Sequence, residues 1–77
     1  MPQIKVHVYA SLRRHVNNAA CVDVEIEPGR TIRQVLSQLQ VPAEETRIVF
    51  INHRAAKLDD ALHGGERVDL FSAIGGG

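Results

Sequence analysis

The C-terminal end of this sequence offers the clearest chemistry, because Gly75, Gly76 and Gly77 follow an alternating apolar segment at 68–74. The α-carboxylate of Gly77, with a reference pKa of about 3.3 to 3.7, is ionised at neutral pH and reacts with nucleophiles only after activation. Residues without a Cβ atom can pass through a narrow channel and adopt backbone conformations closed to other residues. The three glycines therefore make this chain end narrow and conformationally permissive, and its carboxylate a group that needs activation; the alternative is an inert, frayed terminus.

Metal and thiol chemistry are both disfavoured. Cys21 is the single cysteine, which excludes an internal disulfide, a four-cysteine iron–sulfur site and a Cys-x-x-Cys zinc site, and which fits a reducing compartment. The histidines His7, His15, His53 and His63 show no paired ligand spacing. We therefore expect no metal site, and we expect Cys21 to be a small packed or edge residue rather than a nucleophile.

The charged residues do not make a catalytic site either. Asp59 and Asp60 are adjacent, but neighbouring carboxylates in a turn usually face solvent or cap a helix, and no partner base lies near them in the sequence. Arg47 and Arg67 are expected to be surface cations or contacts at the rim of an interface. Because no nucleophile is paired with a base, we expect the chain not to be an enzyme in its own right.

Length and charge bound the class of protein. A chain of 77 residues forms one domain without a deep cleft. Its nine Lys and Arg residues balance nine Asp and Glu residues, and no run of either sign is present, which argues against nucleic-acid or anionic-membrane binding. No apolar stretch approaches the roughly 20 residues that span a bilayer, and the first residues enter a strand pattern without a signal peptide. We therefore expect a cytoplasmic protein whose partner is another protein.

The hydrophobic pattern predicts the elements that position the C-terminal end. Alternating apolar residues predict strands at 4–9 and 22–27, the second with an acidic outer face, and Ser11 could cap a helical turn between them. Thr31 and Gln34 have the spacing of a capping box, which predicts the start of a helix. One apolar stripe follows, and Pro42 should end the helix soon after it; the stripe consists of Ile32, Val35, Leu36 and Leu39.

The rest of the chain predicts a strand at 48–51, a short turn or helical segment around 58–62, a tight turn at 64–65 and a last strand. Several strands and one amphipathic helix favour a two-layer α+β fold, with the helix on one face of the sheet. The other face has no helix to cover it, and we expect a partner to dock there through Val49 or Ile51 together with Phe71. Alternatively, these three side chains all turn inward, and the outer face is polar.

Four features together resemble the MoaD/ThiS family of ubiquitin-like sulfur carriers, over essentially the whole chain. They are the opening stretch at 6–13 (VHVYASLR), the strand at 47–52 (RIVFIN), the turn at 64–67 (GGER) and the terminal glycines. The opening stretch is more similar to the molybdopterin synthase small-subunit branch. The resemblance implies a β-grasp fold with a mixed sheet of four to five strands, adjacent and parallel first and last strands, a domain at 1–71 and a flexible tail at 72–77.

The resemblance also implies a function. A ubiquitin-activating-like adenylyltransferase would use ATP to adenylate Gly77, and sulfur from a donor protein would then displace AMP and leave a C-terminal thiocarboxylate. Ile74, Gly75 and Gly76 would enter the active site of the partner. A sulfur-accepting enzyme, such as a molybdopterin synthase large subunit, would take the sulfur, and the chain itself would bind no cofactor.

Two other functions remain open at this point. A ubiquitin-like protein modifier would use the same activated terminus to form isopeptide bonds with lysines, and a β-grasp interaction module would have an inert tail. The sulfur acceptor is equally open: a molybdenum-cofactor precursor, a thiazole in thiamine biosynthesis, a cysteine precursor, a tRNA base and a secondary metabolite all fit.

Overall fold

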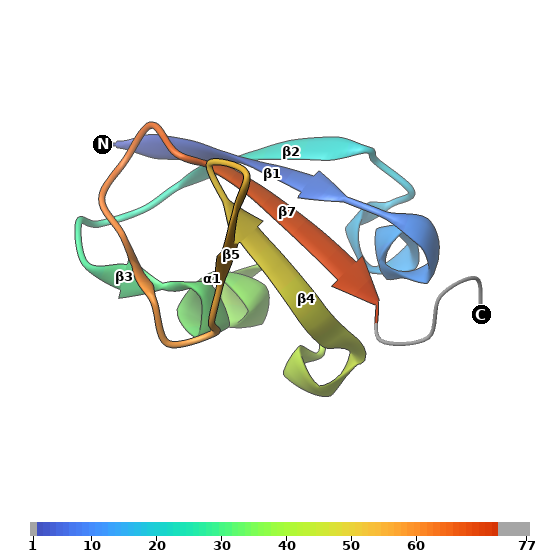
Figure 1. The fold of residues 1–77 in the computed structure, drawn as a ribbon. Coiled ribbons are helices and arrows are strands. Elements are labelled where there is room, and N and C mark those ends of the chain that lie inside the picture. Colours follow the sequence, from blue (N-terminus) through green and yellow to red (C-terminus); the bar gives the residue numbers. More distant parts are fainter. Residues whose placement is uncertain (1, 73–77) are drawn as a thin grey trace.

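The computed structural model describes residues 2–72 as one mixed five-stranded sheet, one α-helix and a small second sheet (Figure 1). In the large sheet the strand order is β2-β1-β7-β4-β5. The pair β1–β7 is parallel and the other neighbours are antiparallel, which confirms both the β-grasp prediction and the parallel pairing of the first and last strands. The bounds of the five strands are β1 Gln3–Val8, β2 Cys21–Glu25, β4 Thr46–Ile51, β5 Arg54–Ala56 and β7 Arg67–Ser72.

The helix α1 comprises Ile32–Leu39 and begins at the predicted capping box. The Thr31 hydroxyl accepts a hydrogen bond from the Gln34 backbone N–H at 3.2 Å, and the Gln34 side chain accepts one from the Thr31 N–H at 2.9 Å. After Leu39 the chain turns at Gln40, whose φ is 61°. The helix thus begins at the predicted capping box and ends three residues before Pro42, as predicted.

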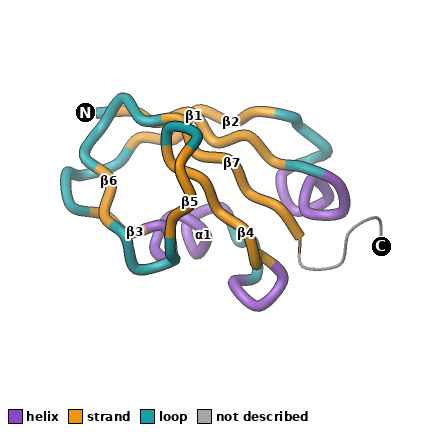
Figure 2. The backbone as a smooth tube through the Cα atoms, in the orientation of Figure 1, coloured by secondary structure: helices purple, strands orange, loops and turns teal. Residues whose placement is uncertain are grey.

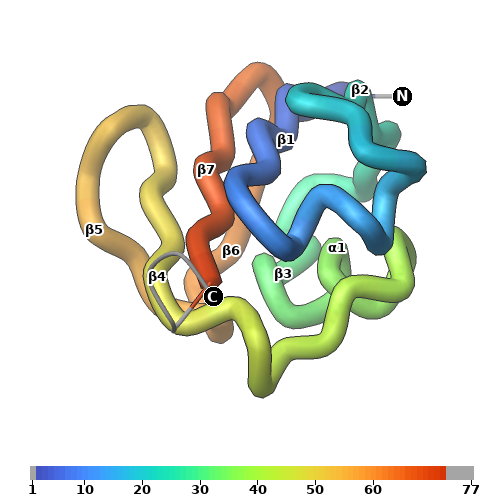
Figure 3. Tube along the Cα trace, turned by 90° about the vertical axis from the view of Figure 1, so that its right-hand side faces the viewer, coloured from blue at the N-terminus to red at the C-terminus, as the bar shows by residue number. Residues whose placement is uncertain are grey.

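The core lies between α1 and the sheet, whose strands follow an arc with α1 on its inner side (Figure 3). The apolar stripe of the helix packs against inward side chains of β1, β2 and β7, as the alternation predicted. The most deeply buried residues of these elements are Ile4, Val6, Val8, Ile32, Val35, Leu36, Val68 and Leu70. The opposite face of the sheet is left uncovered by the described helices (Figures 1 and 3).

Between β1 and β2 the chain forms a 3₁₀ helix, η1, at Ala10–Val16. The predicted helical turn is thus confirmed, and Leu12 is fully buried under it. The predicted cap at Ser11 is wrong, because the N-cap position is occupied by Tyr9 and no side chain caps this helix. A second 3₁₀ helix, η2 at Ala43–Glu45, precedes β4.

The segment around 58–62 contains a strand that the periodicity did not reveal. β6 (Ala61–Leu62) pairs with β3 (Arg30–Thr31) to form the small sheet (Figure 2). The turn that follows requires glycine, because Gly64 has a φ of +127° and a Cβ atom there would lie 2.6 Å from the Cβ atom of Pro2. Gly64 thus lets the last turn close against Pro2, immediately before β1.

Two sequence expectations concern the limits of the domain and its environment. β7 extends through Ser72, one residue beyond the boundary at 71, and the predicted tail residues 73–77 lie outside the described residues. Within residues 2–72, no helix has the length and apolar character needed to cross a membrane. The same residues contain no cluster of His, Cys, Asp and Glu that could hold a metal ion.

Candidate functional site

The uncovered face of the sheet is divided into a polar half and an apolar half. At the end of β7 it carries four apolar or aromatic side chains, which we call the aromatic patch: Tyr9, Ile48, Phe50 and Phe71. Ile48 lies directly opposite Phe71 across the β4–β7 pair. Its exposed fraction is 49%, and no other large apolar residue in the described part of the chain is classed as exposed. Tyr9, Phe50 and Phe71 are partly exposed beside Ile48, and apolar side chains that gather on the surface of a small domain are typical of an interaction surface.

The rings of the patch are stacked in a defined arrangement. The Tyr9 and Phe71 rings lie 4.4 Å apart between centroids and are nearly parallel, at 5°. The Phe50 ring meets the Phe71 ring edge-on, at 5.8 Å and 90°. Such pairs contribute about 0.5–1.5 kcal/mol beyond the area they bury, so the patch is ordered before any partner arrives.

A closed set of hydrogen bonds lies beside the rings. The Tyr9 hydroxyl donates to Asp69 Oδ1 at 2.9 Å. The Arg67 Nη2 group donates to the same Oδ1 atom at 3.2 Å and to the Tyr9 oxygen at 3.4 Å. The Asp69 side chain is only 6% exposed and the Arg67 side chain 41% exposed. Burial by itself would raise the pKa of Asp69, but the hydrogen bonds from Arg67 and Tyr9 outweigh it and hold the pKa below its ordinary value.

Next to the rings the surface is hollowed. A shallow depression of about 260 Å³ is lined by Tyr9, Phe50, His53, Arg67, Asp69 and Phe71. Its walls are aromatic, and the Arg67–Asp69 ion pair contributes charge to its lining. This shape accepts a protruding side chain of another protein rather than a whole small molecule.

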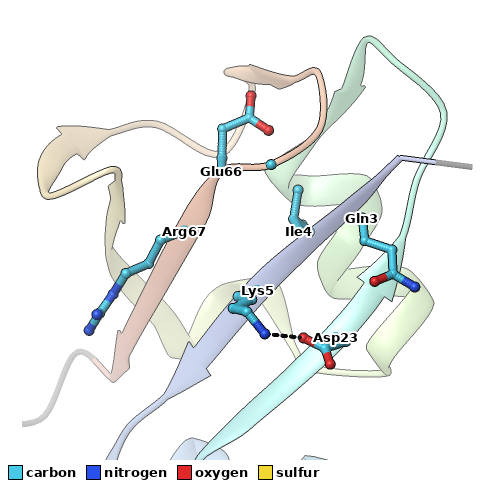
Figure 4. Close-up of a pocket in the computed structure, with 7 residues that line it drawn as sticks. Gln3, Ile4, Lys5, Asp23, Glu66 and Arg67 are labelled. Carbon is cyan, nitrogen blue, oxygen red and sulfur yellow. Dashed lines mark hydrogen bonds and ion pairs between the residues drawn. The ribbon is translucent and has the colours of Figure 1, made fainter.

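The polar half of the same face has a hollow of about 230 Å³ (Figure 4). There Lys5 and Asp23 point toward each other from neighbouring strands and form an ion pair at 3.1 Å, while the Arg67 guanidinium points away from them (Figure 4). The nearby Glu66 carboxylate is occupied, because it accepts the backbone N–H groups of His63 and Gly64 at 2.8 and 2.7 Å. The charged groups of this hollow are therefore paired with neighbouring residues of the same chain. We take the aromatic patch, and not this hollow, as the candidate site.

Two short helices flank the end of β7. The Tyr9 N–H, just before η1, donates to the carbonyl of Leu70, and Thr46, just after η2, pairs with Ser72. The two helices are tied by Glu45 of η2, whose carboxylate accepts from His15 at 3.1 Å and pairs with Arg14 at 3.3 Å, both on η1. The hydrogen bond with His15 is the main cause that lowers the pKa of Glu45.

The structure corrects two of the predicted docking residues. Val49 is only 4% exposed and belongs to the core, and Ile51 packs against the same core. The reason is a bulge at Arg47: Thr46 pairs with Ser72 and Ile48 with Phe71, so Arg47 is an extra residue on β4. Phe71 lies on the uncovered face as predicted. The placement of Val49 and Ile51 on that face is wrong.

Three residues of the site were not predicted from the sequence, namely Ile48, Phe50 and Asp69. Ile48 and Phe50 alternate with Val49 and Ile51 in one unbroken apolar run, so periodicity alone cannot tell which set faces the helix. The sequence did hold a signal for Asp69, which stands between two apolar residues of a predicted strand. A carboxylate in such a position needs a hydrogen-bonding or charged partner if it is buried in the fold.

The other predicted residues lie away from the patch or beyond the described chain. Cys21 is exposed on the edge strand β2. The Asp59 side chain is 81% exposed and pairs with Arg33, and the Asp60 carboxylate accepts the Lys57 N–H at 2.9 Å. The predicted tail residues Ile74, Gly75, Gly76 and Gly77 lie outside the described residues.

Solved structures with the same fold come from archaea and bacteria. The H. volcanii small archaeal modifier protein 1 superposes with a TM-score of 0.77 at 22% identity, over 96% of this chain and 100% of that chain. The putative molybdopterin converting factor, subunit 1, from Pyrococcus furiosus gives a TM-score of 0.74 at 18% identity, over 96% and 100%. A chain from the complex of subunits 1 and 2 of the Helicobacter pylori molybdopterin-converting factor gives a TM-score of 0.63 at 12% identity, over 97% of this chain and 99% of that chain. Among curated protein sequences, none matches.

The family comparison covers almost the whole sequence. The model of the ThiS family matches residues 6–77, a range that includes the second half of β1, all of α1 and β7, and the terminal glycines. The described part of that range has the β-grasp topology shared by the solved structures above. The chain therefore belongs to the ThiS family of small β-grasp proteins.

Proposed function

We propose that this chain is a sulfur carrier protein whose Gly77 carboxylate is adenylated and then converted to a thiocarboxylate. As a ThiS family protein it is a small carrier or subunit and not an enzyme in its own right. The observation that carries the proposal is the aromatic patch at the end of β7, immediately before a sequence that ends in three glycines. A partner would bind the patch while the glycines enter its active site.

The chemistry follows from the state of the terminus. Because the carboxylate is ionised at neutral pH, it needs activation, and an adenylyltransferase of the ubiquitin-activating type would supply it by forming the acyl adenylate and releasing pyrophosphate. Sulfide-level sulfur from a donor protein then displaces AMP. The partner consumes the ATP, the carrier holds no cofactor, and we place the reaction in the cytoplasm because it depends on ATP.

Reach limits where the partner must bind. The residues 73–77 could extend at most about 3.3–3.6 Å each, which gives on the order of 17 Å beyond Ser72. A partner whose active site lies within this distance of its carrier-binding surface therefore has to dock close to the end of β7. The aromatic patch meets that requirement, since Ile48 and Phe71 lie one or two residues from the Thr46–Ser72 pair.

The same face suits transfer of the sulfur. The Helicobacter pylori structure is a complex of subunits 1 and 2 of the molybdopterin-converting factor. By analogy, we propose that a sulfur-accepting enzyme resembling such a large subunit covers the aromatic patch of this chain. The pathway, whether toward molybdopterin, thiamine or another product, depends on which acceptor binds.

The proposal is tested by the mass of the native protein and by activation of the terminus. The native chain that ends at Gly77 should be heavier than the mass calculated from its sequence, by the difference that replacement of one oxygen atom by sulfur makes. Deletion of Gly76 and Gly77 should leave folding intact and abolish ATP–pyrophosphate exchange by the activating enzyme. Exchange that survives the deletion would falsify the proposal.

A second function is favoured by the likeness to the small archaeal modifier protein. A modifier would use the same adenylate but transfer the Gly77 acyl group to a lysine amine of a target protein. Peptide mapping of cell material distinguishes the two functions, because a modifier leaves a C-terminal fragment of this chain on target lysines and a carrier leaves a free thiocarboxylate.

A further inference from the structure

We propose that Asp69 is a positioning residue of the docking site: with Arg67 it holds the Tyr9 ring on Phe71 and neutralises the guanidinium that a docked partner would cover. The inference rests on the proposed docking of a partner to the aromatic patch. It goes further because it assigns a role to a partly buried ion pair that the carrier chemistry itself does not use.

The first argument is the geometry of the hydrogen bonds. The phenol of Tyr9 donates to Asp69 at 2.9 Å and accepts from Arg67 at 3.4 Å, while the guanidinium and the carboxylate are joined at 3.2 Å. Each of the three groups is therefore bonded to the other two. A phenol held at its oxygen cannot swing about its Cα–Cβ bond, so the network keeps the ring over Phe71, and the stacking contact with Phe71 orients its plane.

The second argument is the uneven burial of the pair. The Asp69 side chain has already lost its contact with water, at 6% exposure, whereas the Arg67 side chain keeps 41%. A partner seated on the patch would remove much of what Arg67 retains, because both residues line the depression between the rings. A buried charge is tolerable when it is paired and costly when its partner is missing, so Asp69 makes Arg67 compatible with a covered interface.

The third argument is the position of the carboxylate in the fold. Asp69 lies in β7, between β1 and β4 in the middle of the sheet, where aspartate is disfavoured and an apolar side chain would extend the patch. The apolar alternative would leave Arg67 and the Tyr9 hydroxyl without their shared acceptor. The polar group therefore orders the patch, although it lowers the apolar area available for docking.

A test without any partner uses the fact that Tyr9 is the single tyrosine and that tryptophan is absent. Near-ultraviolet circular dichroism and tyrosine emission therefore report on this one ring. Asp69→Ala should reduce the near-ultraviolet tyrosine band by about half or more and raise the emission, because a hydrogen-bonded carboxylate quenches a phenol. Asp23→Asn, an exposed carboxylate on the same face, should change neither signal. An unchanged tyrosine band in a folded Asp69→Ala protein would overturn the inference.

A second test measures docking to the enzyme that performs ATP–pyrophosphate exchange with the wild-type chain. Asp69→Asn should weaken binding about tenfold, since Arg67 would be covered without a counter-charge, and the neutral double variant Arg67→Gln/Asp69→Asn should recover binding to within about threefold. Equal affinities of wild type and Asp69→Asn, or a double variant weaker than Asp69→Asn, would overturn the inference. Far-ultraviolet circular dichroism confirms that each variant is folded.

The variant Ile48→Asp separates this inference from the proposed function. It places a charge in the patch, directly opposite Phe71, at a residue that takes no part in the Arg67–Asp69 ion pair. If Ile48→Asp binds the enzyme as tightly as wild type, docking on this face is refuted. If Ile48→Asp fails to bind while Asp69→Asn binds normally, docking stands and the role assigned to Asp69 is refuted.

Discussion

Neighbouring residues of β4 should respond in opposite ways to substitution, because the bulge at Arg47 turns Ile48 outward and Val49 inward. Val49 is 4% exposed, whereas Ile48 is 49% exposed. Val49→Ala removes two methyl groups from the core, each with a transfer free energy of about 0.8 kcal/mol. With the cavity that remains, the free energy of unfolding should fall by about 2 kcal/mol.

Ile48→Asp is the matched variant at the next position. Its side chain is half exposed, so the free energy of unfolding should change by less than about 1 kcal/mol, while binding to the activating enzyme should be lost. Val49→Ala, in contrast, should bind normally under conditions where it is folded. Stability and docking are thus separated between two adjacent residues.

Urea unfolding followed by far-ultraviolet circular dichroism measures the stability of both variants. A total stability of roughly 4–12 kcal/mol is expected for a domain of 77 residues. Val49→Ala should therefore remain folded in water and show a lower midpoint with an unchanged slope. The assignment of the two faces is refuted if Ile48→Asp is destabilised as strongly as Val49→Ala, or if Val49→Ala unfolds at the wild-type midpoint.

Three further outcomes are expected from stability measurements. The folded-state pKa of Asp69 lies below its ordinary value of 3.8. Its ion pair with Arg67 therefore stabilises the protein above that pH, and this stabilisation is lost as the pH falls below it. The free energy of unfolding of the wild type should thus fall more steeply below pH 3.8 than that of Asp69→Asn. Gly64→Ala should cost at least about 1–2 kcal/mol, measured as a lower urea midpoint, because of its positive φ and the contact with Pro2. Thr31→Ala should cost about 1 kcal/mol by the same measurement through loss of the helix cap.

Much of the fold could be predicted because its signals are local. The capping box at Thr31 and Gln34 satisfies the first turn of α1 with atoms only three residues apart, and Pro42 predicts the end of the helix at Leu39, within three residues. The alternation in β1 and β2 assigns a face to each side chain, since polar and apolar residues differ at every step. The chemistry expected of the glycines at 75–77 stays a prediction, because these residues lie outside the described part of the chain.

Other features depend on pairings between distant segments. β6 is two residues long and exists because it meets β3, about 30 residues earlier in the chain. Such a short strand has no periodicity of its own. The face of the run at 48–51 is likewise decided by the bulge against β7, and every residue of that run is apolar, so the pattern is compatible with either register.

The sequence by itself determined the class of fold, the helix and its ends, and the inward faces of the first two strands. Only the tertiary structure decided which apolar residues face outward at the end of β7, and that Asp69 is hydrogen-bonded to Tyr9, 60 residues away. The physical reason is that capping and alternation act within a few residues of the chain. A docking surface, in contrast, is made by strands whose register is set through the packing of the whole sheet on α1.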